Sequence, residues 1–220
     1  MIKDSIKPFA ILQSNAVQEL ETLLSNEPTA ATATNDQGIS LLLMAVYMGN
    51  KKAVSVIKKF KTALSPWEAA CTGEKEQLED LLKNDLTLIK ATSADGFSLL
   101  GYACFFQQKS IAQMLIEEGA DINKPSQNEM KVAPLHSASA VSDYDLCKLL
   151  LEHGAAVNAR QQGGYTALHA AAQNGKTELA HLLLDHGADK NILTDKGDSA
   201  VMLANAKSHN ETADFIATYN

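Results

Sequence analysis

Several residue types on which common functional classes depend are scarce in this chain of 220 residues. Aromatic residues make up only 5% of the sequence, Arg160 is the one arginine, and the formal net charge is −7. Nucleic-acid-binding surfaces usually combine clustered arginines with aromatic residues and an overall positive charge. The composition therefore predicts that the chain binds no nucleic acid.

Long apolar runs are also missing, and cysteines are few. The longest apolar run, from Leu41 to Met48, falls well short of the roughly 18 residues that a membrane helix requires. Charged residues interrupt the N-terminus, so it has no signal-peptide core. Cys71, Cys104 and Cys147 show no metal or redox spacing, and an odd number of cysteines without a secretion signal favours reduced thiols. We therefore predict a cytoplasmic protein that does not cross a membrane.

The sequence does contain an internal repeat. The segment from Leu135 to Asn158 returns 33 residues later as Leu168 to Asn191, with Leu-His at the head and Gly-Ala near the tail of each copy. A run of three leucines occurs in both copies at the same offset. A period near 33 with Thr-x-Leu-His-x-Ala and Leu-Leu-Leu-x-x-Gly-Ala-Asp resembles the ankyrin repeat, in which each unit is a turn plus two helices. This resemblance implies an all-α solenoid whose core forms where the units stack.

The repeat continues in both directions with degenerate ends. Turns containing Asp and Gly at 36–38, 95–96 and 195–197 begin further units, and residues 6–26 fit weakly as a leading helix pair. The resemblance implies about seven stacked helix pairs with short β-turn fingers, in a single ankyrin-repeat domain of residues 1–220. The expected units are residues 6–35, 36–61, 62–94, 95–127, 128–162, 163–195 and 196–220.

One finger is expected to be missing. The step from Gly187 to Val201, the lead position of the next helix, is 14 residues, whereas the step from Lys61 to Pro66 is only 5. The difference of 9 residues equals the length of a projecting hairpin, so the gap should lie near residues 62–65. This order of units resembles a group of compact bacterial ankyrin proteins, and the resemblance indicates the fold rather than the function.

Motifs for catalysis and metal binding are absent from the sequence. It contains no Gly-x-Ser-x-Gly, phosphate loop or His-Glu-x-x-His. His136 and His169 occupy the Thr-x-Leu-His position, where the imidazole typically bonds to the backbone of adjoining turns. His153 and His186 lie at equivalent positions of adjacent repeats, about 10 Å apart, which is too far to share a zinc ion bound at ~2 Å. We therefore predict no catalytic residue, no metal site, no cofactor and no enzyme activity.

Charge is distributed unevenly along the chain. Residues 1–66 hold 7 lysines and 5 acidic residues, and the lysines at 51, 52, 58, 59 and 61 fall in one helix pair. Such a run usually forms a solvated helix face, with cations favoured near the helix C-terminus. We therefore interpret these lysines as part of the outer surface.

The resemblance also indicates where a partner would bind. In ankyrin arrays, contacts usually come from the finger tips and from the two residues before the mid-repeat glycine. At these positions the N-terminal half of the array is apolar and aromatic and the C-terminal half is polar, and grouped exposed aromatic residues mark a binding patch. The alternative is that Phe105 and Phe106 pack under the neighbouring finger. The expected partner-binding residues are Tyr47, Met48, Phe97, Phe105, Phe106, Val141, Tyr165, Gln173 and Asn174.

The predicted function is that of a non-catalytic module for protein–protein interaction. It would act as a monomer and bind an unidentified protein through its concave face. One alternative is an accessory or regulatory subunit of a cytoplasmic enzyme, which would bind its enzyme in the same way but change its turnover. The other is a secreted bacterial effector adaptor.

Overall fold

The computed structural model describes residues 2–220, with side chains from Lys7 onward. The described residues form fourteen α-helices and three short 3₁₀ helices. They divide into two compact units, one ending at Asn84 and the other comprising Asp85–Asn220. That residues 1–220 form a single domain stays a prediction.

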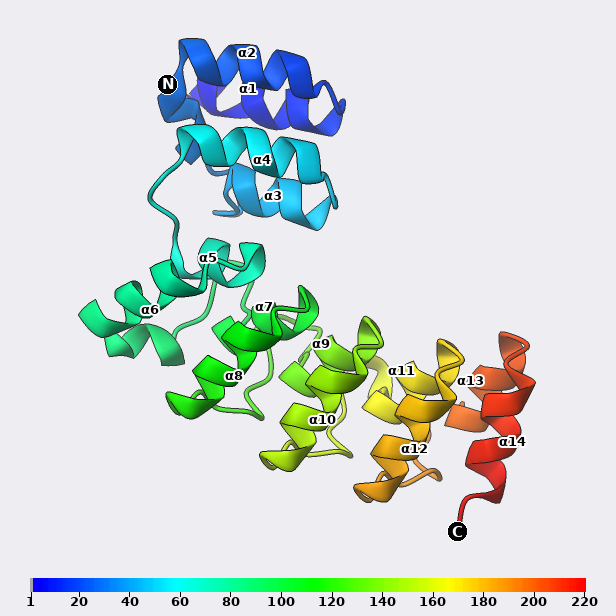
Figure 1. The fold of residues 1–220 in the computed structure, drawn as a ribbon. Helices are drawn as coiled ribbons and strands as arrows, with labels where there is room; N and C mark the ends of the chain where they lie inside the picture. The colour runs from blue at the N-terminus through cyan, green and yellow to red at the C-terminus, as the bar shows by residue number, and fades with distance from the viewer. Residues whose placement is uncertain (1) are drawn as a thin grey trace. The chain divides into compact units, whose positions relative to one another are not determined.

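The first unit consists of three helix pairs (Figure 1). They are α1 (Ile2–Gln13) with α2 (Val17–Asn26), α3 (Leu41–Tyr47) with α4 (Lys51–Phe60), and α5 (Pro66–Thr72) with α6 (Lys75–Asn84). Helix α3 packs against α1 and α5, and α4 packs against α2. Leu20, Leu24, Leu41 and Ile57 are completely buried between them. The first helix begins at Ile2, which is earlier than the expected start of the first repeat at residue 6.

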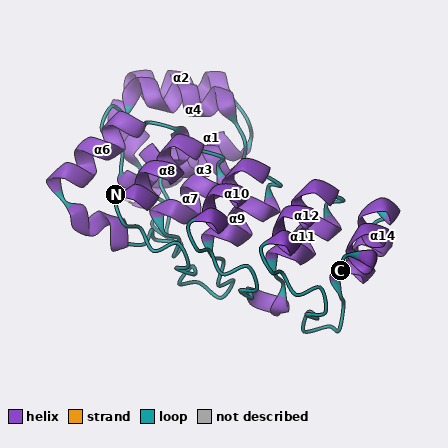
Figure 2. Ribbon diagram, turned by 60° about the horizontal axis from the view of Figure 1, so that its bottom comes forward, coloured by secondary structure: helices purple, strands orange, loops and turns teal. Residues whose placement is uncertain are grey.

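The second unit consists of four helix pairs (Figure 1). They are α7 (Leu99–Phe105) with α8 (Lys109–Glu117), α9 (Pro134–Ala140) with α10 (Tyr144–Glu152), α11 (Ala167–Gln173) with α12 (Thr177–Asp185), and α13 (Ala200–Ala206) with α14 (Asn210–Thr218). First helices pack on first helices and second helices on second helices, an arrangement visible in Figure 2. The alanines Ala138, Ala171 and Ala204 are fully buried, so the short first helices approach closely. The seven expected helix pairs are thereby confirmed.

The second helices carry the large side chains of the core. Leu150 and Leu183 are completely buried and Leu182 is 6% exposed, as the leucine runs predict. Leu149 is only half-buried, although Leu182, its equivalent one repeat later, is buried.

Short fingers connect most of the pairs. Each finger is closed by a backbone hydrogen bond between its ends, at residues 35–39, 93–97, 126–132, 161–165 and 194–198. The finger at 126–132 is longer than the others because of a local insertion in the repeat. In the second unit, successive fingers are also joined by backbone bonds, such as that from Gln127 N–H to the Gly96 carbonyl at 2.8 Å. The fingers therefore stabilise the stack along with the helices.

The finger expected to be missing is indeed missing. Residues 61–65, between α4 and α5, contain no closed turn of this kind. The segments at 28–32 and 86–90, where the Gly-Ala-Asp closure is absent from the sequence, form 3₁₀ helices instead. Proline or aspartate at the start of these turns replaces the glycine-based closure of the later repeats.

A buried carboxylate lies where the finger is absent. Glu68 on α5 is completely buried; its Oε1 accepts hydrogen bonds from Lys61 Nζ and Ser40 Oγ, each at 2.5 Å. Its Oε2 accepts from the Ser65 N–H at 2.8 Å and completes a capping box at the start of α5. Burial alone raises the pKa of Glu68, but the bonds from Lys61, Ser40 and Ser65 outweigh it and hold the pKa below its usual value. This group therefore ties α3 to α5 as a charged carboxylate.

Candidate functional site

The C-terminal ends of the first helices form the candidate surface of the second unit. Phe105 and Phe106 lie at the end of α7, Val141 just beyond α9, and Gln173 and Asn174 at the end of α11. Phe105 is 43% exposed, Gln173 and Asn174 are exposed, and the other two are half-buried. The surface therefore changes from aromatic at α7 to polar at α11.

The aromatic end of this surface is a cluster of four rings: Phe97, Tyr102, Phe105 and Phe106. The rings of Phe105 and Phe106 meet edge to face at a centroid distance of 5.1 Å, and Phe106 stacks on Tyr102 at 5.8 Å. Phe97 meets Tyr102 edge-on at 5.9 Å. Such pairs are worth about 0.5–1.5 kcal/mol beyond their area. The structure thus brings together the three phenylalanines that the sequence indicates in this unit, around one tyrosine.

Tyr102 is the residue that the sequence reasoning missed. Its side chain is 2% exposed, and its hydroxyl donates to Asp95 in the preceding finger at 2.8 Å. The spacing of four between Tyr102 and Phe106 places both on one helix face, so this signal was present in the sequence. Tyr102 thereby links the finger to the ring of Phe106, which in turn contacts Phe105.

At the polar end, Asn174 links two repeats and Tyr165 contacts a residue of its own repeat. Asn174 Nδ2 donates to the Ala140 carbonyl at 3.3 Å and to Ser142 Oγ at 3.2 Å. Tyr165 is half-buried and meets the imidazole of His169 edge-on at 5.9 Å. These two side chains therefore have structural partners in the free protein as well as accessible surface.

Tyr47 and Met48 belong to the first unit. They end α3 and are 39% and 43% exposed. Their expected grouping with Phe97, Phe105 and Phe106 in one apolar stretch stays a prediction.

The histidines of the Thr-x-Leu-His position bond to backbone. His136 Nδ1 accepts from the Ala133 N–H at 3.1 Å, and its Nε2 lies 2.9 Å from the Ala159 carbonyl. This arrangement requires a neutral ring with the proton on Nε2. His169 Nδ1 accepts from the Thr166 N–H at 3.1 Å. The two histidines lie in the first turns of α9 and α11, where each ring binds the backbone of the residue just before its helix.

Stability should consequently fall as the pH is lowered through the ordinary histidine range. Burial lowers the pKa of His136 and His169 below the usual 6.5. At a pH between the folded-state pKa and the unfolded-state pKa of 6.5, the unfolded chain binds protons that the folded chain does not. The free energy of unfolding is therefore highest above pH 6.5 and decreases as the pH falls below it. Thermal melts at about pH 7.5 and pH 5.5 should show a lower Tm at the acidic value.

The matched control for this experiment is His153, which is exposed. His153→Gln should reproduce the pH dependence of the unmodified protein, whereas His136→Gln should reduce it. An unchanged pH dependence in the His136→Gln variant would contradict the assignment of the buried histidines as its source.

The other reactive side chains are buried or dispersed. The three cysteines are buried thiols, and burial raises the pKa of Cys71 and Cys147 to about 12. Thiols with such values stay protonated at neutral pH and are poor nucleophiles. Within residues 7–220, no three His, Cys, Asp or Glu side chains are grouped so that they could hold a metal ion. No helix of the described chain has the length and hydropathy of a membrane span.

Comparison with known families agrees with this architecture. A family model described as ankyrin repeats (3 copies) matches residues 66–161 and 135–220, which together cover most of the chain. The chain belongs to the ankyrin-repeat proteins.

Several curated proteins are similar to part of the sequence. An ankyrin repeat protein of Acanthamoeba polyphaga mimivirus is 27% identical over 166 residues, which is 76% of this chain but 18% of the relative. One of fowlpox virus is 35% identical over 80 residues, covering 36% of this chain and 18% of the relative. The mouse RelA-associated inhibitor is 31% identical over 92 residues, covering 42% and 11%. The chain thus spans less than a fifth of each, and the resemblance to bacterial ankyrin proteins stays a prediction.

Proposed function

We propose that this protein is a non-catalytic interaction module that binds a partner protein through its concave face. Ankyrin repeats generally mediate protein–protein interaction, which supports the general class. The observation that carries the particular site is Phe105, whose ring is 43% exposed at the end of α7. An exposed aromatic ring at the predicted contact position has a hydration cost that binding would remove.

The packing around Phe105 suits it to be an anchor. Its ring rests edge-on against Phe106, which in turn stacks on the buried Tyr102. Little side-chain entropy is therefore left to lose on binding, and pre-organised aromatic residues of this kind are common hot spots. Gln173 and Asn174 supply hydrogen-bonding groups toward α11. We propose that a partner places an apolar group on Phe105 and polar groups on Gln173 and Asn174.

Phe105→Ala should weaken partner binding by more than about 1 kcal/mol while changing the free energy of unfolding by less than about 1 kcal/mol. The partner would first be isolated by capture from the native cell extract with mass spectrometry. Affinity for the purified partner would then be measured by titration calorimetry, and stability by chemical denaturation.

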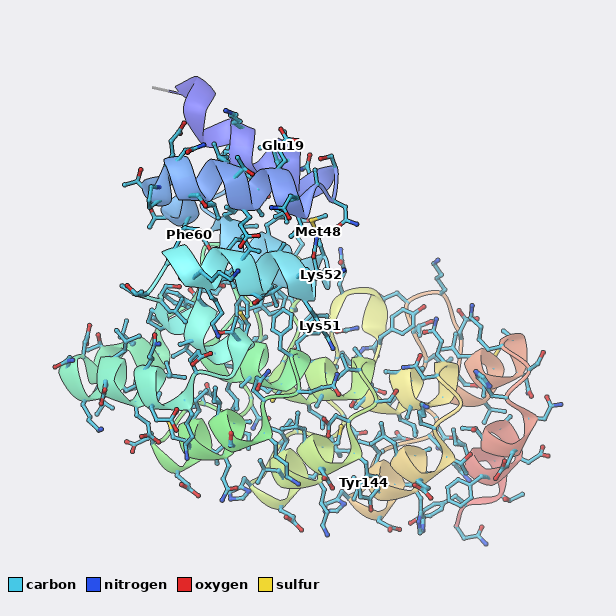
Figure 3. The ribbon with its side chains drawn as sticks, turned by 45° about the horizontal axis from the view of Figure 1, so that its top comes forward. Glu19, Met48, Lys51, Lys52, Phe60 and Tyr144 are labelled. Carbon is cyan, nitrogen blue, oxygen red and sulfur yellow. The ribbon has the colours of Figure 1, made fainter. Side chains whose placement is uncertain are left out.

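Tyr144 provides the matched control, since it is an aromatic residue of similar exposure, 41%, at the start of the second helix α10 (Figure 3). Tyr144→Ala should leave binding unchanged. A large loss of stability in Phe105→Ala with unaltered affinity would instead assign the ring to the core. Capture of one stoichiometric metabolic enzyme whose turnover changes on binding would favour the accessory-subunit alternative, and capture of host proteins the effector adaptor.

The same proposal includes a monomeric protein in the cytoplasm that binds neither nucleic acid nor membrane. It is supported by the acidic composition, with a net charge of −7. Light scattering on the purified chain would test the oligomeric state directly, since a stable dimer would double the measured mass.

A further inference from the structure

The lysine cluster on α4 and after it separates into two groups in the structure. Three of its members are paired with carboxylates of the same unit: Lys58 with Glu74, Lys59 with Glu21, and Lys61 with Glu68. The other two, Lys51 and Lys52, are exposed, and no carboxylate described in residues 7–220 lies within 4.0 Å of either ammonium group. Of the five lysines of this cluster, Lys51 and Lys52 are therefore the two that pair with no carboxylate of residues 7–220.

The position of these two lysines is unfavourable for the helix. They occupy the first turn of α4, where the positive end of the helix dipole favours anions and disfavours cations. The N-terminus is already capped, because Asn50 Oδ1 accepts from the Ala53 N–H at 3.0 Å. Folding of α4 thus gives no reason for lysine at these two positions.

Exposed apolar side chains lie directly beside them. Tyr47 and Met48 end α3 at 39% and 43% exposure, and one short turn separates them from Lys51. Figure 3 shows Met48, Lys51 and Lys52 at the same end of the α3–α4 pair. That turn is fixed, since Asn50 Nδ2 donates to Asn15 Oδ1 at 2.8 Å in the preceding pair. The four residues Tyr47, Met48, Lys51 and Lys52 are named the apolar–cationic patch.

We propose that the apolar–cationic patch binds an acidic segment of a partner protein that carries an apolar side chain. The inference rests on the proposed function and specifies the partner's chemistry. Carboxylates would lie on Lys51 and Lys52, where they also offset the repulsion from the helix end, and the apolar side chain would pack on Tyr47 and Met48. Methionine adapts its shape to varied partners. Because the whole chain has a net charge of −7, other surfaces repel an acidic segment and direct it to this patch.

A random peptide display library, selected on the full-length protein, provides the probe. Recovered peptides should be rich in Asp and Glu next to an apolar residue. Their affinity should fall about tenfold or more in the Lys51→Glu/Lys52→Glu variant and decrease as salt is raised from about 0.05 M to about 0.5 M. Lys90→Glu/Lys148→Glu is the matched control, since it changes two exposed lysines of the second unit that lie outside the fingers and the first-helix ends, and it changes the net charge equally. It should leave the affinity unaltered.

The other outcomes separate this inference from the proposed function. Recovered peptides that lack acidic residues, an affinity unaffected by Lys51→Glu/Lys52→Glu, or no recovered peptide would each overturn the inference. Peptides that depend on Phe105 but not on the lysines would overturn it while supporting the proposed interaction surface. Binding of phosphatidylserine vesicles or DNA that is lost in the lysine variant, without acidic peptides, would also overturn it in favour of another polyanion.

Discussion

Glu68→Ala is expected to destabilise the first unit by about 3–5 kcal/mol, the usual cost of breaking a buried ion pair by removing one partner. The side chain of Lys61 is only 10% exposed, so its ammonium group would be left in a poorly solvated site. Ser40 and the Ser65 N–H would lose their acceptor as well. Chemical denaturation, followed by a probe that reports on the first unit, would measure the loss.

The exposed pair Lys59–Glu21, with an N–O distance of 2.7 Å, is the matched control. Because surface pairs contribute about 0–1 kcal/mol, Glu21→Ala should have a small effect. Glu68→Leu combined with Lys61→Met should recover part of the loss, since apolar replacement of both partners removes the unpaired charge. Equal stabilities of Glu68→Ala and Glu21→Ala would show that the buried carboxylate does not stabilise the contact between α3 and α5.

The contribution of Glu68 to the free energy of unfolding should also depend on pH, and it should be lost at acidic pH. Its folded-state pKa is lowered from 4.5, so the stabilisation is complete above that value and disappears as the pH falls through the lower folded-state pKa. The difference in stability between the unmodified protein and Glu68→Ala should therefore decrease only in acid.

Leu183→Ala is expected to cost about 2–5 kcal/mol, the sum of the lost burial and the cavity left behind. Leu183 is completely buried on α12, which packs against α10, α11 and α14. The rigid stack on both sides limits how far neighbouring helices can relax into the cavity. A loss of stability at one repeat also weakens its contacts with two others, because repeats are held by nearest-neighbour interfaces.

Leu193→Ala provides the comparison, since this leucine is 47% exposed beside the last finger. It should change the free energy of unfolding by less than about 0.5 kcal/mol. Denaturation curves of both variants, analysed for the midpoint and the slope, would measure the two effects. Similar curves for Leu183→Ala and the unmodified protein would mean that α12 packs in a different register.

Much of this fold could be predicted because its rules are local. The period of 33, the Leu-His heads and the glycine turns repeat within short segments, so they predict helix pairs, fingers and the gap near residues 62–65. Side-chain partnership at a distance could not be predicted in the same way. The hydrogen bond from Ser40 to the buried Glu68 joins residues 28 positions apart, and no local pattern indicates it.

The sequence by itself therefore determined the repeat architecture, whereas the positions at which a partner would be contacted stay a prediction from it. Tertiary structure decided how individual side chains are used: Glu68 is a buried acceptor paired with Lys61, whereas Lys51 and Lys52 pair with no carboxylate of residues 7–220. The physical reason is the separation along the sequence of the residues on which each property depends. Helix periodicity and turn conformation depend on neighbours in the chain, whereas burial and ion pairing depend on which helices stack together, and that information is spread over residues far apart in the sequence.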